Sequence, residues 1–149
     1  MLQINYDIYS NPLNNNEWSF PLFECIHIAM FAMSIGTIAV VDFRMLGLGL
    51  RRQTPSELLK ATSLWTLIGL IVVITSGMVI WSSDPLRYYY SPPFRFKIIT
   101  LLIAIVYNYT LHRKAAASDA RAPWGPLAAG VSLLIWITII FAGIFYAFW

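Results

Sequence analysis

The sequence predicts an all-α integral membrane protein: a four-helix bundle with both termini outside the cytoplasm. Of its 149 residues, 58% are hydrophobic and only 11% are charged, whereas soluble proteins average roughly 25% charged residues. The hydrophobic residues are gathered into four long runs, and a helix needs about 20 apolar residues to cross the hydrocarbon core of a bilayer. A soluble monomer with so few charges could not cover its surface with polar groups.

The four apolar runs cover residues 20–41, 61–81, 98–111 and 127–149. Only Glu24 and His27 interrupt the first run, and the second and fourth contain no charge. The third run would extend only about 21 Å as a helix, so its span must include flanking residues. We therefore expect helices at about 20–43, 55–82, 92–114 and 124–148, forming one transmembrane domain over residues 20–149 after a polar tail at 1–19.

Local signals mark where the second and third helices begin. Thr54, Pro55 and Glu57 have the spacing of a capping box with proline in the first turn, which predicts a helix start before the second apolar run. Ser91 followed by Pro92 predicts the start of the third helix in the same way.

The distribution of lysine and arginine predicts the orientation. Four of these residues lie between the first and second spans (Arg44, Arg51, Arg52, Lys60), three between the third and fourth (Arg113, Lys114, Arg121), and three between the second and third (Arg87, Arg95, Lys97). Positive charge accumulates on the cytoplasmic side, so both termini are expected in the periplasm of a bacterial inner membrane. The tail carries acidic but no basic residues and is interpreted as a translocated extension rather than a signal peptide.

Ionisable groups within a span are rare and mark the places where chemistry or pairing is expected. If Phe20 and Phe94 are level at the outer boundary, Glu24 and His27 lie about 6 and 10 Å deep at 1.5 Å per residue. Other polar or sulfur-containing residues are then expected in the same outer layer: Thr75, Ser76, Met78, Arg95 and Lys97.

This outer layer has a structural and a functional interpretation. In the structural one, Glu24 pairs with Arg95 or Lys97, and His27 hydrogen-bonds a hydroxyl of Thr75, Ser76 or Thr100. In the functional one, the layer is a copper or haem site. The oxygen of Glu24 and the imidazole of His27 would be joined there by a thioether from Met30 or Met78, a ligand suited to copper(I). A lipid, quinone or substrate pocket is a further alternative. The structural interpretation requires no cofactor.

Depth argues against haem held by two histidines of one chain, and leaves haem held by one histidine, with a methionine or an open position, or shared between copies. His112 lies about 27 Å from the outer boundary, about 17 Å below His27, and one iron cannot span that separation with bonds near 2 Å. His112 is instead expected to end the third helix, where a cationic side chain is favourable.

A second polar layer is expected at the inner boundary. It comprises Asp42, Arg44, Asn108, His112 and Arg113. The simplest interpretation is an ion pair of Asp42 with Arg44 or Arg113 that holds the first and third helices in register. Few polar groups lie between the two layers, which argues against a continuous proton path.

The remaining sequence features favour a protein without catalytic activity. It contains no phosphate-binding loop, nucleophile motif or paired catalytic carboxylates, and its basic loops are read as membrane anchors, not as a nucleic-acid surface. Small residues at Ala32/Gly36 and Gly143/Ala147 would allow helices to approach closely. The expected partners are the lipid bilayer and either further copies of the chain or other membrane subunits.

Several short segments resemble a family of bacterial membrane proteins known only as a domain of unknown function. They are residues 18–27, Gly36, residues 41–47, Arg51 and Arg52, residues 75–77, residues 94–97, and Asn108 with His112 and Arg113. The chain is more distantly similar to the four-helix membrane domain of copper-resistance D-type proteins. The resemblance implies a four-helix inner-membrane protein and draws attention to Glu24, His27, Asp42, Arg44, Arg95, Lys97 and His112, and the copper likeness implies periplasmic copper.

Two functional hypotheses follow. In the first, the protein is a non-catalytic subunit or scaffold of a larger membrane assembly. In the second, His27 binds copper or haem with Glu24, Met30 or Met78 for metal delivery or electron transfer.

Overall fold

The computed structural model describes residues 7–49, 52–118, 123–146 and 148, and no strand occurs among them. A 3₁₀ turn, η1 (Ile8–Ser10), precedes α1 (Ser19–Met45), α2 (Pro55–Ser83) and the short α3 (Pro85–Tyr90). The third span is continuous but consists of α4 (Pro92–Tyr107), the π-helical turn η2 (Asn108–His112) and α5 (Arg113–Ala117), and α6 (Gly125–Tyr146) follows. The predicted all-α class is confirmed.

Four helices are long and apolar enough to cross a membrane: Ser19–Met45, Pro55–Ser83, Pro92–Ala117 and Gly125–Tyr146. Many of their large side chains face outward, as shown by Leu64, Val106 and Leu134, each more than 60% exposed. Apolar surface on this scale is stable in lipid and not in water. The chain is therefore a multi-pass membrane protein, as the sequence predicted.

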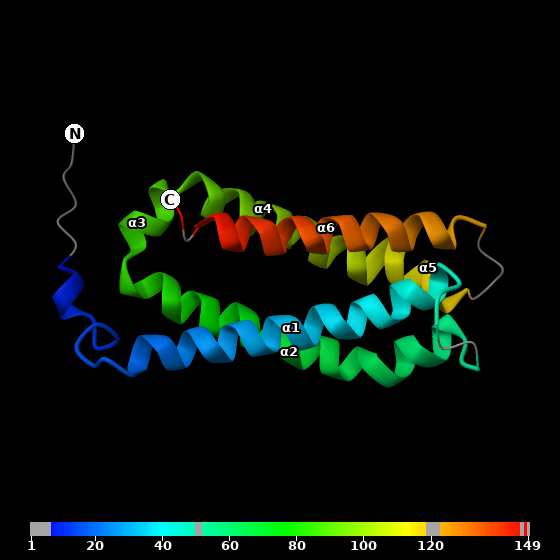
Figure 1. Ribbon diagram of the computed structural model, residues 1–149, viewed down its shortest axis with the longest axis horizontal. Helices are drawn as coiled ribbons and strands as arrows, with labels where there is room; N and C mark the ends of the chain where they lie inside the picture. Colours follow the sequence, from blue (N-terminus) through cyan, green and yellow to red (C-terminus); the bar gives the residue numbers. More distant parts are fainter. Residues whose placement is uncertain (1–6, 50–51, 119–122, 147, 149) are drawn as a thin grey trace.

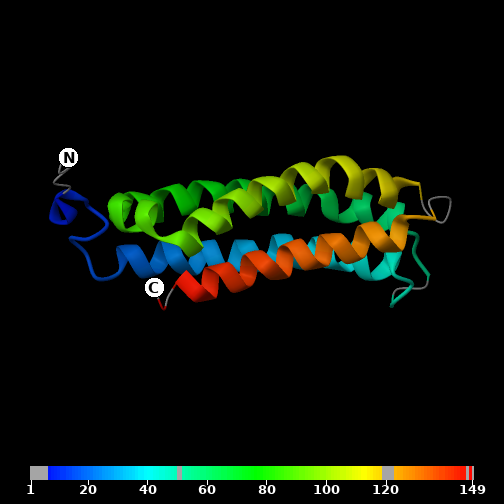
Figure 2. The same ribbon diagram turned by 90° about the horizontal axis from the view of Figure 1, so that it is seen from above.

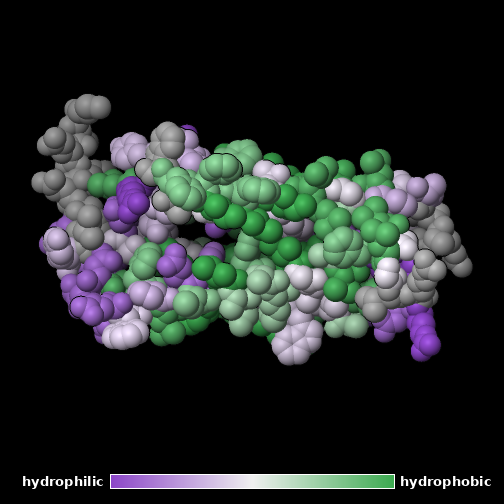
Figure 3. All heavy atoms as spheres, viewed as in Figure 1, coloured by the Kyte–Doolittle hydropathy of each residue, from purple (hydrophilic) through white to green (hydrophobic). Residues whose placement is uncertain are grey.

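The four spans run antiparallel to their neighbours in a two-by-two arrangement, in which α1 packs on α2 and α6, and α6 packs on α4 (Figures 1 and 2). We call the end where α1 begins and α6 ends the tail end, and the opposite end the loop end. Near the loop end, α2 contacts α5. Towards the tail end α2 and α4 diverge, and the surface is hollowed between the α1–α2 and α4–α6 pairs (Figure 3). The bundle is therefore closed at one end and open at the other.

The predicted capping box at the start of α2 is confirmed. The hydroxyl oxygen of Thr54 accepts from the backbone N–H of Glu57 at 3.2 Å, and the carboxylate of Glu57 accepts from the backbone N–H of Thr54 at 2.8 Å. These bonds satisfy two amide groups that the first turn leaves free. Asp84 caps α3 similarly by accepting from the backbone N–H of Arg87 at 3.1 Å.

Helices α1 and α2 approach each other closely at Ser34 and Gly69. Ser34 is fully buried, and a methyl group on Gly69 would overlap its hydroxyl oxygen. Ala32 and Gly36 do not mark such an approach within the described chain, because a methyl group on Gly36 would meet nothing within 4 Å. Gly143 contacts a lysine side chain instead of a helix backbone. Its expected partner Ala147 lies outside the described residues.

Two buried clusters form the core. The first lies near the loop end and contains Val41, Met45, Leu58, Ala115, Ala116, Ala128 and Ala129. The second lies nearer the middle and contains Ile38, Leu70, Ala104, Trp136 and Ile139. The alanines of the first cluster bring α5 and α6 close to α1, and so position the polar groups described next.

Candidate functional site

Three polar side chains from three different spans meet near the loop end. Asp42 lies in the last turn of α1, His112 ends η2, and Ser132 lies two turns into α6; none is more than 1% exposed. The carboxylate of Asp42 accepts from Nε2 of His112 at 2.5 Å through one oxygen and from the hydroxyl of Ser132 at 2.8 Å through the other. We call these three residues the Asp42 cluster.

The Asp42 cluster replaces the pairing that the sequence suggested. Among the described residues, the one ion pair is His112 with Asp42. Asp42 does not pair with Arg44 or Arg113: the guanidinium of Arg44 donates to the backbone carbonyl of Gln53 at 2.5 Å, and the exposed side chain of Arg113 lines the cavity described next. His112 was expected only to end the third helix, but its side chain is also buried against α1. Arg51 and Arg121, which were counted in predicting the orientation, lie outside the described residues.

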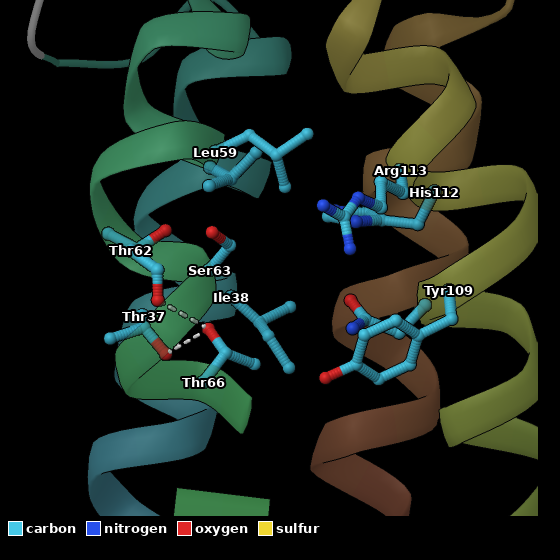
Figure 4. Close-up of a pocket in the computed structure, with 11 residues that line it drawn as sticks. Thr37, Ile38, Leu59, Thr62, Ser63, Thr66, Tyr109, His112 and Arg113 are labelled. Carbon is cyan, nitrogen blue, oxygen red and sulfur yellow. Dashed lines mark hydrogen bonds between the residues drawn. The ribbon is translucent and has the colours of Figure 1, made fainter. Parts of the chain in front are cut away.

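The π-helical turn that carries His112 also borders a small cavity between the α1–α2 pair and the third span (Figure 4). The cavity has a volume of about 20 Å³, and hydroxyl groups of Thr37, Thr62, Ser63 and Thr66 line one side of it. Thr37 and Thr66 hydrogen-bond each other at 2.8 Å, while Asn108 lines the side opposite. Isolated π turns of this kind are frequent at functional sites.

His27 lies in the tail-end half, where its Nδ1 is 3.0 Å from the hydroxyl oxygen of Ser76. The hydroxyl of Ser76 donates its one hydrogen to the carbonyl of Val72 at 2.6 Å. The tautomer of His27 that fits this arrangement donates from Nδ1 to Ser76 and leaves the lone pair on Nε2. The predicted hydrogen bond from His27 to a hydroxyl on the second helix is confirmed with Ser76.

Lys97 lies deeper than the sequence suggested. Its ammonium nitrogen is 5.6 Å from the centre of the Phe31 ring, and Phe31 is thirteenth of the 27 residues of α1. The third span begins deeper than α1 because α3 and its turns intervene, so Phe94 packs against Tyr88 and Tyr146 instead of lying level with Phe20. The half-buried ammonium of Lys97 therefore lies near mid-depth.

The expected pairing of Glu24 with Arg95 or Lys97 does not form among the described residues. Glu24 and Arg95 both face outward, and Lys97 turns into the bundle. Lys97 thus has no carboxylate partner in the described chain. A cation–π contact contributes about 1–2 kcal/mol, which is less than the roughly 3 kcal/mol cost of lysine at the centre of a span.

The sulfur ligands proposed for a metal lie apart from the histidine's hydrogen-bonding face. Met78 is 63% exposed, and Met30 is partly exposed one turn beyond His27. The described residues contain no group of three or more His, Cys, Asp and Glu side chains that could hold a metal.

A further pocket of about 260 Å³ opens at the tail end. It is lined by Asn14, Phe20, Ser83, Asp84, Arg87, Tyr88 and Tyr146. The guanidinium of Arg87 lies 5.8 Å from the centre of the Tyr146 ring, and Tyr88 stacks on Tyr146 at 4.9 Å between ring centres. Burial raises the pKa of the Tyr88 phenol, which therefore stays neutral.

Sequence reasoning missed Ser132, Phe31 and Gly143. Ser132 and Thr138 are the two aliphatic hydroxyl residues of the largely apolar fourth run, and this isolation of Ser132 could have drawn attention to it. Phe31 and Gly143 carry no chemical signal of their own. Their importance comes from Lys97, which lies against both.

Comparison with known proteins places residues 20–149 within the model of a "Family of unknown function (DUF6644)". No curated protein and no solved structure matches the chain.

Proposed function

The chain belongs to the DUF6644 family, and we propose that it is a non-catalytic subunit or scaffold of a larger membrane assembly. The observation that carries this proposal is the Asp42 cluster, in which both carboxylate oxygens accept hydrogen bonds from side chains of other spans. Both oxygens of the Asp42 carboxylate are thereby committed to bonds between spans, which hold the helices in register. This cluster is thus assigned to assembly of the spans.

Two glycines without a packing neighbour support contact with another membrane subunit. Gly36 on α1 and Gly130 on α6 have open space where a side chain would begin, and α1 and α6 lie side by side on one face of the bundle (Figure 2). Small residues allow a helix from another chain to approach closely, which is how helices associate in lipid.

A bacterial inner membrane with both ends in the periplasm is the orientation that we propose. The start of α1 and the end of α6 lie at the tail end (Figure 1), and seven of the ten lysine and arginine residues lie in or beside the two connections at the loop end. The positive-inside rule then places the loop end in the cytoplasm. Attaching a reporter to the C-terminus tests this: alkaline phosphatase should be active there and green fluorescent protein should not.

Purification in a mild detergent tests the assembly. We expect a protein mass well above the 16.9 kDa of one chain, as measured by native mass spectrometry. Replacing both Gly36 and Gly130 with leucine should lower that mass by blocking the small-residue face, whereas Leu64→Ala and Leu134→Ala, on exposed leucines, serve as controls. A single chain at all protein concentrations, in detergent and in lipid nanodiscs, would contradict the proposal.

Copper or haem binding by His27 is the second candidate, and one observation favours it. Because Nδ1 donates to Ser76, Nε2 is held in a fixed direction with a free lone pair, as in many metal-binding histidines. The nearby ammonium of Lys97, which shares the Phe31 ring with His27, disfavours a bound cation. The resemblance of the sequence to copper-resistance D-type membrane domains adds only a similar arrangement of helices.

Elemental analysis and a visible spectrum separate the two candidates. We expect no Soret band and less than one copper per chain after gentle purification. Stoichiometric metal or haem that is lost in His27→Ala and kept in Glu24→Ala would replace the scaffold proposal. His27→Ala should leave the oligomeric mass unchanged if His27 serves only as a ligand.

A further inference from the structure

Lys97 places a positive charge deep within the bundle without a counter-charge in the described chain. Its ammonium lies over Phe31, about 18 Å along α1 from Ser19. Ionisable side chains at this depth are rare and usually have a partner or a ligand.

The lysine does not take the usual route to the membrane surface. Side chains on a helix lean towards its N-terminus, which for α4 is the tail end, and lysines near a helix end extend to the headgroup region. Lys97 instead reaches across the bundle. A methyl group on Gly143 of α6 would lie 3.3 Å from its ammonium nitrogen, and the ring of Phe31 on α1 lies on another side.

Small residues provide the space in which Lys97 and His27 lie. Gly143 leaves room for the lysine, and Gly77 leaves room for His27, whose Cε1 would be 3.1 Å from a methyl group there. Both side chains contact Phe31: the imidazole stacks on the ring at 6.4 Å and the ammonium lies over it. Phe31 therefore lies against both the ammonium of Lys97 and the imidazole of His27.

We propose that Lys97 binds a lipophilic monoanion, whose carboxylate or phosphodiester group pairs with its ammonium. One negative charge neutralises the single ammonium, whereas a dianion would leave an excess charge in an apolar region. The aromatic ring of Phe31 beside the ammonium suits an acyl chain and not a hydrated ion. A fatty acid and an anionic phospholipid both supply this chemistry.

The tail end offers a path to the site. The hollow between the two helix pairs opens in this half of the bundle (Figure 3). The pocket of about 260 Å³ that Arg87 lines also lies at the tail end. Tyr146, which lines that pocket, is one turn beyond Gly143 on α6. Arg87 thus provides a positive charge at the entrance and Lys97 one further in. This inference is independent of the oligomeric state.

Thermal unfolding in a non-ionic detergent tests the site, with the fluorescence of the six tryptophans as the signal. Oleate supplies the carboxylate, phosphatidylglycerol the phosphodiester, and phosphatidylcholine and inorganic phosphate are the controls. Oleate or phosphatidylglycerol should raise the Tm by about 5 °C at roughly a hundred times its Kd. The more effective of the two identifies the source of the anion.

Lys97→Met should abolish this shift, and Arg95→Met should retain it because it removes an exposed charge from the same helix. In the absence of ligand, Lys97→Met should also have a higher Tm than the wild type, since it removes a charge that lacks a partner. Absence of any shift in the wild type, or equal shifts in wild type and Lys97→Met, would overturn the proposal. So would an equal loss in Arg95→Met, which would indicate attraction to surface charge, or a shift with inorganic phosphate alone.

Discussion

Replacing Asp42 with alanine should destabilise the folded protein by about 3–5 kcal/mol, the usual cost of breaking a buried pair by removing one partner. The change leaves the imidazole of His112 and the hydroxyl of Ser132 without their acceptor in a region that water does not reach. It also removes an interaction that joins α1, the third span and α6 through side chains at a single point. Unfolding by sodium dodecyl sulfate titration in mixed micelles measures the free energy.

Two variants control this experiment. Asp42→Asn keeps the shape and can accept from His112 while its amide donates to Ser132, so we expect a loss of about 1–2 kcal/mol. Glu24→Ala removes an exposed carboxylate from the same helix and should change stability by less than about 0.5 kcal/mol. If Asp42→Ala were no more destabilising than Glu24→Ala, the Asp42 cluster would not be the tie between spans that the scaffold proposal requires.

Gly69→Ala should have the second-largest effect, a loss of about 1–3 kcal/mol from overpacking. The added methyl group would overlap Ser34 and lie 3.1 Å from the backbone carbonyl oxygen of Met30. A backbone atom cannot rotate aside as a side chain can, so α1 and α2 must separate. The contact between His27 and Ser76, about two turns away along both helices, should loosen with them.

Gly36→Ala is the matched control for that prediction. It is the same substitution within a helix, but the new methyl group meets nothing within 4 Å. Because alanine favours the helix over glycine, we expect stability to rise by up to about 1 kcal/mol. Detergent titration of the two variants side by side gives the comparison. Equal effects of the same sign would show that the α1–α2 approach at Gly69 does not limit packing.

The two polar regions of the bundle lead to opposite interpretations for one physical reason. A buried charge is stable when its hydrogen bonds are satisfied, and it demands a partner when they are not. Asp42 has both oxygens bound within the chain, so its region holds the spans together. Lys97 has an aromatic ring but no described carboxylate, so its region is where a ligand is expected.

Local chemistry explains what was predictable from particular residues. The capping box at Thr54 and Glu57 needs only neighbours in the chain, and the hydrogen bond of His27 needs only a hydroxyl at similar depth on the adjoining helix. Lys97 and His112 were placed less well. The depth of Lys97 depends on the short helix α3, and the direction of His112 depends on the π-helical turn η2. No local sequence pattern predicted the depth of Lys97 or the direction of His112.

The amino-acid sequence by itself determined that this chain is helical and crosses a membrane four times, because the transfer of each apolar run into lipid is a sum over its own residues. Only the tertiary structure decided that Asp42 meets His112 and Ser132 and that Lys97 faces Phe31. It also decided that α1 and α2 approach each other closely at Gly69, whereas no helix of the described chain approaches Gly36. These contacts depend on the rotation and relative depth of whole helices. Both are set by how all four spans pack together, which no single segment encodes.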